Sequence, residues 1–147
     1  LGLTLCGLAA RDPLRLEAGM PLYGHELSID TLPAQVGVGR SVALKTKGDF
    51  VGRAAVEAGP AADAPVLVGL VAEGRRAGRA GYPVLDGDAE VVVVTSGALS
   101  PTLGHPIAMA LVEPGSATSD SLSVDVRGTK LPARVTQLPF YTREARA

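Results

Sequence analysis

The stretch Pro-Val-Leu-Asp-Gly-Asp-Ala-Glu-Val-Val-Val-Val-Thr, residues 83–95, decides the fold class. The mostly apolar segments 83–85 and 90–95 flank Asp86-Gly87-Asp88, and a short polar sequence with a central glycine is typical of the turn of a β-hairpin. The acidic residues of this turn lack the later glycine and glutamate that an EF-hand calcium loop requires. We therefore expect a hairpin here, and we expect no metal site.

Further short apolar segments continue on both sides of this hairpin. They are separated by turns rich in glycine and proline, and they cover residues 66–72, 107–112, 122–126 and 131–138. Arg127-Gly128 forms a second expected hairpin tip. Six short strands with little helix between them predict a small antiparallel barrel or sandwich in the second half of the chain.

The first half reads differently. Gly59–Pro65 has the composition of a linker, and the residues before it predict a short helix that begins after Asp49 and ends at Gly59-Pro60. Residues 36–44 alternate weakly between apolar and other residues, which predicts a strand softened by glycine. We expect two units, with residues 1–58 in one and residues 66–142 in the other.

The stretch from Arg11 to Leu27 gathers charged and apolar side chains in a pattern that a plain core element lacks. Leu14-Arg15-Leu16-Glu17 alternates apolar and charged residues, which predicts a strand with one buried face. Glu17, placed at a strand end before Gly19, is a fair acceptor for a pair of N–H groups on a ligand. The alternative is that Glu17 pairs with a neighbouring arginine in a surface network.

Composition excludes several classes of protein. The chain of 147 residues carries 14 basic and 15 acidic side chains and only five aromatic ones, so neither charge nor stacking surface favours nucleic acid. No apolar run is long enough to span a membrane. Cys6 is the single cysteine, so no disulfide framework is expected, which fits a reducing compartment; we expect a cytoplasmic location.

Cations gather in two places. Arg75, Arg76 and Arg79 lie within the irregular segment 73–81, and Lys45 and Lys47 precede the expected helix. Such a cluster on a loop is usually solvated surface. Arranged around one pocket, however, these cations would suit an anionic ligand tail such as a carboxylate.

Several motifs, in order along the chain, resemble the glycine cleavage system T protein family of tetrahydrofolate-dependent aminomethyltransferases. The motifs are Cys-Gly-Leu-Ala-Ala-Arg-Asp-Pro-Leu-Arg-Leu-Glu-Ala-Gly-Met-Pro-Leu-Tyr-Gly-His-Glu-Leu at 6–27, Lys-Gly-Asp-Phe-Val-Gly-Arg at 47–53, Gly-Tyr-Pro-Val at 81–84, Val-Thr-Ser-Gly-Ala-Leu-Ser-Pro-Thr-Leu-Gly at 94–104 and Leu-Pro-Phe-Tyr at 138–141. Together they correspond to roughly the last two fifths of a full-length member.

The resemblance implies a mixed α+β fold that is mostly β in this segment. Residues 1–58 would be the C-terminal end of the folate-binding α/β domain with a linking helix, and residues 66–142 would be the C-terminal antiparallel β-barrel. The family transfers a methylene group from the aminomethylated lipoyl arm of the H protein to tetrahydrofolate and releases ammonia. The implied partners are therefore the lipoylated H protein and tetrahydrofolate as co-substrate, with no metal.

The resemblance also assigns residues. Glu17 matches the family glutamate that hydrogen-bonds the pterin ring, Lys47 falls where members carry a basic residue near the folate, and Arg143 lies near the tail position that closes on the folate. The family's catalytic aspartate belongs to residues that this chain does not contain. We therefore expect no catalytic residue in this segment, and we expect the 147 residues alone to be inactive.

Three alternatives stay open on the sequence. The first is the folate-binding portion of a dimethylglycine- or sarcosine-oxidising flavoenzyme, which shares the fold and would carry a dinucleotide fingerprint upstream. The second is a non-catalytic folate-binding or assembly protein of the same fold. The third is a barrel that serves only to dock another protein.

Overall fold

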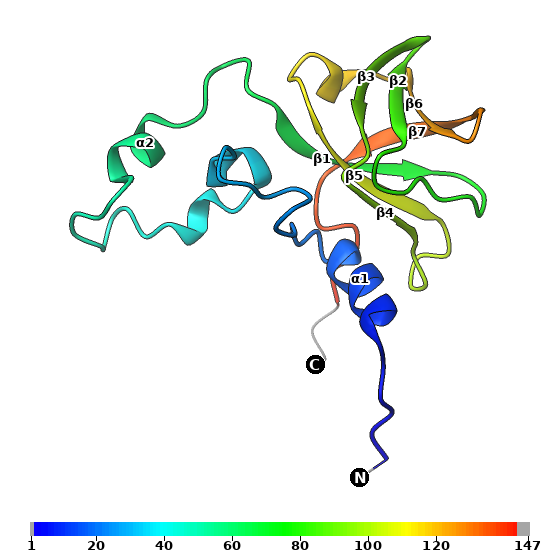
Figure 1. The fold of residues 1–147 in the computed structure, drawn as a ribbon, viewed down its shortest axis with the longest axis horizontal. Coiled ribbons are helices and arrows are strands. Elements are labelled where there is room, and N and C mark those ends of the chain that lie inside the picture. The colour runs from blue at the N-terminus through cyan, green and yellow to red at the C-terminus, as the bar shows by residue number, and fades with distance from the viewer. Residues whose placement is uncertain (1, 144–147) are drawn as a thin grey trace.

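A computed structural model describes residues 2–143, and the second half of the chain forms an antiparallel β-barrel (Figure 1). Its strands are β1 (Val66–Ala72), β2 (Pro83–Asp86), β3 (Ala89–Val93), β4 (Ser96–Leu99), β5 (Pro106–Val112), β6 (Leu122–Val126) and β7 (Thr129–Thr136). They lie in the order β3-β2-β6-β7-β1-β5-β4, and every pairing is antiparallel. The barrel fold expected from the sequence is therefore confirmed.

The two outer strands of this order are consecutive in the chain, which is how the sheet closes on itself. Only Val94 and Thr95 separate β3 from β4. The Val94 N–H donates to the Tyr82 carbonyl beside β2 at 2.8 Å, and the Thr95 N–H donates to the Met109 carbonyl in β5 at 2.8 Å. One continuous segment therefore leaves one end of the sheet and joins the other, so little strand edge remains exposed.

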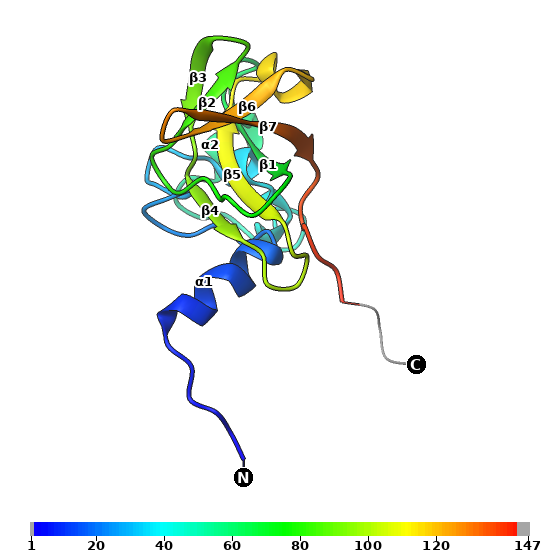
Figure 2. The same ribbon diagram turned by 90° about the vertical axis from the view of Figure 1, so that its right-hand side faces the viewer.

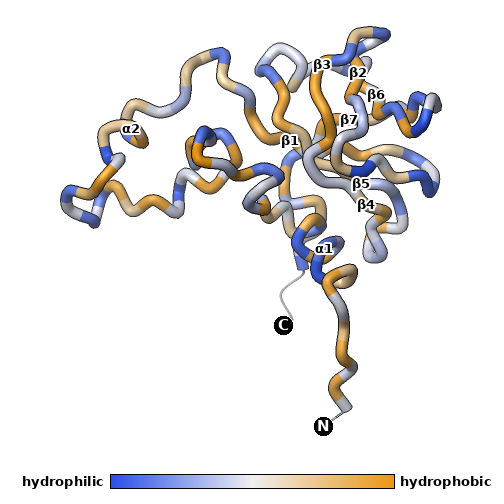
Figure 3. Tube along the Cα trace, in the orientation of Figure 1, coloured by the Kyte–Doolittle hydropathy of each residue, from blue (hydrophilic) through white to orange (hydrophobic). Residues whose placement is uncertain are grey.

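The expected hairpins are present. Asp86 pairs with Ala89 across Gly87-Asp88, and Val126 pairs with Thr129 across Arg127-Gly128. Both loop residues of the second hairpin have positive φ, 56° and 81°, as a tight two-residue turn between twisted strands requires. Figure 3 shows hydrophilic residues gathered at the hairpin tips and hydrophobic ones along the strands.

The sequence predicted six strands of the barrel, and the strand that it missed is β4. Its residues Ser96–Leu99 contain two small residues and a glycine, so they lack the alternating apolar pattern. Gly97 is required here because a Cβ at this position would overlap the carbonyl of Gly78 on a neighbouring segment. Close backbone packing, rather than apolar side chains, therefore holds this strand.

Alternate residues of the strands face two separate cores. The barrel interior contains twelve buried apolar residues from five strands and the β3–β4 connection: Val68, Leu70, Ala72, Val84, Val94, Ala108, Ala110, Val112, Leu122, Val124, Val126 and Ala133. Ile107 and Met109 alternate with these along β5 and face outward, where they pack with Ala98 and Leu16. The outer face of β4 and β5 is thus covered by the segment that carries Leu16.

That segment is a helix, α1 (Leu8–Glu17), and the predicted strand over residues 14–17 is wrong. A strand would have buried Leu14 together with Leu16, but Leu14 is 64% exposed and Leu16 is fully buried. The consecutive residues Arg15, Leu16 and Glu17 are all buried in the last turn of α1. Alternation misled because the two charged side chains are buried through hydrogen bonds rather than turned to solvent. Figures 1 and 2 show α1 running from the N-terminal segment up to the barrel.

The predicted strand over residues 36–44 is also wrong, because this region forms two 3-10 helices, η1 (Pro33–Val36) and η2 (Gly39–Ser41). Gly37 ends η1 in the left-handed conformation, with φ of 76°, so the glycines act as helix ends rather than as soft points of a strand. A third 3-10 helix, η3 (Ser116–Thr118), lies between β5 and β6.

The expected helix before the linker is shorter than predicted. It is α2 (Arg53–Ala58), which begins after Gly52 and ends at Gly59. The Asp49 carboxylate bonds the N–H of Phe50 at 2.9 Å and does not cap the helix. In Figure 1, α2 and the segment before it stand apart from α1 and from the barrel.

Candidate functional site

The C-terminal end of α1 reaches the barrel through a tight turn. Gly19 has φ of 65°, and the Met20 N–H donates back to the Arg15 carbonyl at 2.9 Å. A Cβ at Gly19 would lie 3.0 Å from Leu138 Cβ and 3.1 Å from the Cα of Pro139, so the residues after β7 pack directly on this turn. The helix end, the barrel and the C-terminal segment therefore meet at one place.

Glu17 lies at this junction and is buried, with an exposed fraction of 3%. Oε1 accepts hydrogen bonds from the Ser100 hydroxyl at 2.5 Å and from the Thr102 N–H at 3.0 Å. Oε2 accepts one from the Thr102 hydroxyl at 2.8 Å. The turn between β4 and β5 thus supplies every partner of the carboxylate among the described residues, and one acceptor position of Oε2 remains.

The pKa of Glu17 is lowered from its ordinary value of 4.5 by these contacts. Burial acts most strongly and raises the pKa, because it disfavours the charged form. The hydrogen bonds from Ser100 and Thr102 stabilise the carboxylate and together outweigh the burial. Glu17 is therefore a buried anion at neutral pH.

A second charged cluster lies in the same last turn of α1, around Arg15. The guanidinium donates to Asp12 at 2.9 Å, to Glu26 at 3.2 Å and to the Ser96 hydroxyl at 2.8 Å. Glu26 is fully buried, and its Oε2 also accepts the Leu22 N–H at 2.9 Å. Its Oε1 has no partner among the described residues. Arg15 therefore ties α1, the following loop and β4 together around one buried carboxylate.

Sequence reasoning identified Glu17 but missed the residues that hold it and its neighbour, namely Ser96, Ser100, Thr102 and Glu26. Three of these fall within residues 94–104, which the sequence analysis had singled out as a family motif without assigning a role. Their hydroxyl groups gave no specific signal in the sequence, because serine and threonine in a turn commonly bond the neighbouring backbone.

The other two residues named from the resemblance lie in different places. Lys47 is exposed in the segment before α2, where its Nζ lies 5.2 Å from the centroid of the Phe50 ring. Arg143 is exposed at the end of the described chain, and the Tyr141 N–H two residues earlier donates to the Glu17 carbonyl at 2.9 Å. The structure therefore brings the segment carrying Arg143 to Glu17, while the segment carrying Lys47 stands apart.

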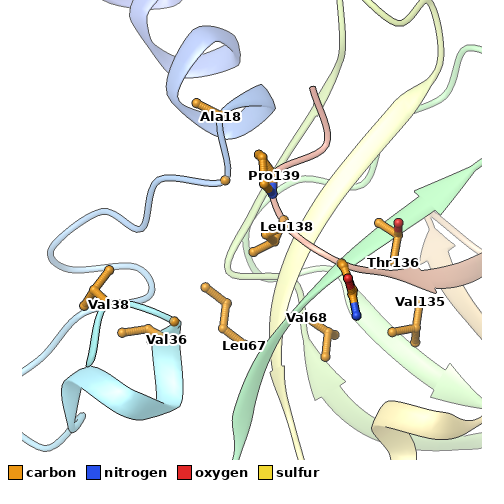
Figure 4. Close-up of a pocket in the computed structure, with 12 residues that line it drawn as sticks. Ala18, Val36, Val38, Leu67, Val68, Val135, Thr136, Leu138 and Pro139 are labelled. Atoms are coloured by element: carbon orange, nitrogen blue, oxygen red, sulfur yellow. The ribbon is translucent and has the colours of Figure 1, made fainter. Parts of the chain in front are cut away.

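A cavity of about 530 Å³ adjoins this junction (Figure 4). It lies between the turn after α1, the region of η1 and residues of β1 and β7. In Figure 4, Val36, Leu67 and Leu138 lie around the same space. Thr136 and Gln137 contribute polar groups to an otherwise mostly apolar wall. Its volume falls within the range of small-molecule sites.

Between residues 2 and 143, no group of three or more histidine, cysteine, aspartate or glutamate side chains is placed to hold a metal ion. None of the helices described there has the length and apolar character needed to cross a membrane.

Comparisons with known proteins agree with this architecture. Residues 66–142 match the model of the glycine cleavage T-protein C-terminal barrel domain. The chain is 63% identical to an aminomethyltransferase of Cutibacterium acnes over 142 residues, covering 96% of this chain and 38% of that protein. It is 56% identical to an aminomethyltransferase of Streptomyces coelicolor, covering 97% of this chain and 40% of that one.

A solved structure is also similar. The glycine cleavage system aminomethyltransferase T of Bartonella henselae superposes with a TM-score of 0.78 at 35% identity, covering 92% of this chain and 39% of that one. The chain thus spans about two fifths of the length of the relatives that it matches. The match to the barrel-domain model covers more than half of the residues of this chain. The chain therefore belongs to the glycine cleavage T-protein family.

Proposed function

We propose that this chain is part of a cytoplasmic, tetrahydrofolate-dependent aminomethyltransferase of the glycine cleavage system. The whole enzyme would take the methylene carbon from the aminomethyl-lipoyl arm of the H protein, pass it to tetrahydrofolate and release ammonia. The observation that carries the proposal is the 63% identity to an aminomethyltransferase over nearly the whole chain. Identity at this level favours the T protein over the flavoenzyme and docking alternatives.

Within that enzyme, we infer that Glu17 accepts a pterin N–H on Oε2. Oε1 already accepts two hydrogen bonds, whereas Oε2 accepts only that of the Thr102 hydroxyl among residues 2–143. The lowered pKa keeps the carboxylate ionised, so a bond to a ligand N–H would be charge-assisted. Because the barrel holds the carboxylate in place, the carboxylate would fix the orientation of the pterin ring. A fixed orientation of bound reactants favours transfer between them.

Arg143 and Lys47 complete the proposed folate contacts. The bond from Tyr141 to the Glu17 carbonyl supports a place for Arg143 near the same ligand. Lys47 lies on a separate segment, so it would contact a different part of the folate. We place no catalytic group among these 147 residues, because the family's aspartate lies outside them, and we expect them alone to support no transfer.

The test is a calorimetric titration of tetrahydrofolate into the full-length protein, its Glu17→Gln variant and its Thr102→Val variant. Glu17→Gln removes the charge from the acceptor, so we expect binding to weaken by about 1.5–3 kcal/mol. Thr102→Val removes the competing hydroxyl and leaves the carboxylate, so folate binding should persist. Equal affinity of wild type and Glu17→Gln would contradict the role of Glu17, and absence of binding to wild type would contradict the proposed function.

A further inference from the structure

A second pocket, of about 480 Å³, lies on the barrel away from the residues proposed for folate. Its lining comes from the β1–β2 connection, the β6–β7 hairpin tip and the start of β7, and consists of Arg76, Ala77, Arg79, Tyr82, Val126, Arg127 and Thr129. We call it the arginine pocket. Three of its seven residues are arginines, and none is acidic.

The β1–β2 connection is fixed to the barrel between two of these arginines. Gly78 is buried, and its carbonyl lies so close to Gly97 of β4 that a Cβ there would overlap it. A Cβ on Gly78 itself would lie 2.7 Å from Val124 Cγ1. Arg76 and Arg79 therefore extend from either side of an anchored point, although both side chains are exposed.

Neutral oxygens hold each guanidinium at the pocket. Arg76 donates to the Thr129 hydroxyl at 3.1 Å, and Arg79 donates to the Gly97 carbonyl at 3.5 Å. Arg127 donates through Nε to the Tyr82 hydroxyl at 3.2 Å, which leaves the phenolic O–H free to donate. These contacts orient the side chains without neutralising them.

The charges of the pocket are unbalanced within the described chain. Over residues 2–143, the ion pairs involve Arg15, Arg53 and Lys130, and none involves an arginine of this pocket. Each guanidinium has five N–H donors and uses one in the contacts above, so most of its donors are available to a ligand. Three like charges around one concave space are relieved by an anion, and the planar guanidinium matches two oxygens of a carboxylate or phosphate.

We propose that the arginine pocket binds a small oxyanion, namely the phosphate or carboxylate group of a small-molecule ligand. Its concave shape and the convergence of donors from three segments favour a small ligand over the flat surface of an acidic protein. Glu17, Lys47 and Arg143 do not line it. The inference therefore stands apart from the proposed folate site, and either can fail without the other.

The test is a titration of inorganic phosphate, and separately of citrate, into the full-length protein at low ionic strength. Arg76→Gln and Arg79→Gln remove one pocket charge each, and Arg75→Gln removes an exposed charge of the same segment that does not line the pocket. We expect saturable binding of at least one anion, weakened roughly tenfold or more by each pocket variant and unchanged within about twofold by Arg75→Gln.

The two anions distinguish a phosphate group from a carboxylate group as the ligand, and saturation by either supports the proposal. Equal losses for all three variants would show only the general attraction of a basic loop and would overturn it. Absence of binding by both anions would also overturn it. So would tight binding of an oligoglutamate peptide where neither small anion binds, because that result would indicate an acidic protein partner.

Discussion

The carboxylate of Glu17 joins α1 to the barrel, so its removal should destabilise the fold and not only a ligand site. The Glu17→Ala substitution removes the acceptor of three hydrogen bonds from Ser100 and Thr102, in a place where the side chain is 3% exposed. Hydrogen bonds to a charged group contribute about 1.5–3 kcal/mol each, and their losses are not additive.

The full sum would overestimate the effect, because the Ser100 hydroxyl keeps one of its two hydrogen bonds, the one that its oxygen accepts. The Ser100 oxygen still accepts the Leu103 N–H at 2.9 Å, whereas the Thr102 N–H and hydroxyl lose their only partner among the described residues. We therefore expect a loss of about 3 kcal/mol in the free energy of unfolding for Glu17→Ala, and about half of that for Glu17→Gln, which keeps one acceptor oxygen.

Urea unfolding followed by far-ultraviolet circular dichroism measures this loss, since the chain has no tryptophan for fluorescence. Asp88→Ala is the matched control, because Asp88 is also a hydrogen-bonded carboxylate, which accepts a bond from Lys130 at 2.5 Å, but is fully exposed. The midpoint should fall clearly for Glu17→Ala and hardly change for Asp88→Ala. Equal midpoints for the two variants would refute the reasoning that the buried carboxylate holds α1 on the barrel.

Four further predictions concern the titration of Glu17, the Arg15–Glu26 pair, Met109 and Gly97. Because the pKa of Glu17 is lowered below 4.5, the stabilising contribution of its carboxylate is present above about pH 4.5 and is lost as the pH falls through the folded-state pKa. The difference in unfolding free energy between wild type and Glu17→Gln should therefore narrow in that acid range. A difference that widened there would contradict a lowered pKa. Arg15→Met leaves the fully buried Glu26 without its cation and should lower the free energy of unfolding, measured in urea, by about 3–5 kcal/mol. The Arg15→Met/Glu26→Leu double variant should recover part of this loss. A double variant no more stable than the single one would argue against an uncompensated buried charge. Met109→Ala should cost about 2–5 kcal/mol because Met109 is fully buried, whereas Val51→Ala at a fully exposed position should leave the midpoint unchanged; similar midpoints would place Met109 outside the core. Gly97→Ala forces a Cβ onto the Gly78 carbonyl and should lower the thermal midpoint, whereas Gly48→Ala, which meets open space, should not; a tolerated Gly97→Ala would show that the β1–β2 connection is not anchored there.

The sequence predicted the barrel well where side-chain patterns carry the structure. The β2–β3 and β6–β7 hairpins have polar turns between apolar runs, and β1 and β5 are long apolar segments, so all were found. These elements depend on local turn chemistry and on burial of alternate residues, both of which are visible in one sequence.

The errors arose where distant contacts decide the backbone. Residues 14–17 alternate like a strand, yet they form the last turn of a helix, because Ser96, Ser100 and Thr102 satisfy the buried Arg15 and Glu17 from more than 80 residues away. β4 has no apolar pattern because it is packed through backbone at Gly97. Such contacts between distant segments cannot be predicted from the local sequence.

The same limit applies to the site. Glu17 could be selected from its neighbours and from the family resemblance, but its partners could not, since hydroxyl residues in a turn have many local uses. The arginines of the β1–β2 connection were recognisable as a cluster. Their convergence with Arg127 and Tyr82 required the fold, because the hairpin tip is some 50 residues further along the chain.

We propose that the whole protein is an aminomethyltransferase to which these residues contribute the barrel and a folate-binding carboxylate. The most direct measurement is ammonia release by the full-length protein, supplied with aminomethylated, lipoylated H protein, in the presence and absence of tetrahydrofolate. We predict release that depends on tetrahydrofolate, is reduced in Glu17→Gln and is undetectable for the 147 residues alone. Full-length protein that binds tetrahydrofolate but releases no ammonia, or release that is independent of tetrahydrofolate, would contradict the account.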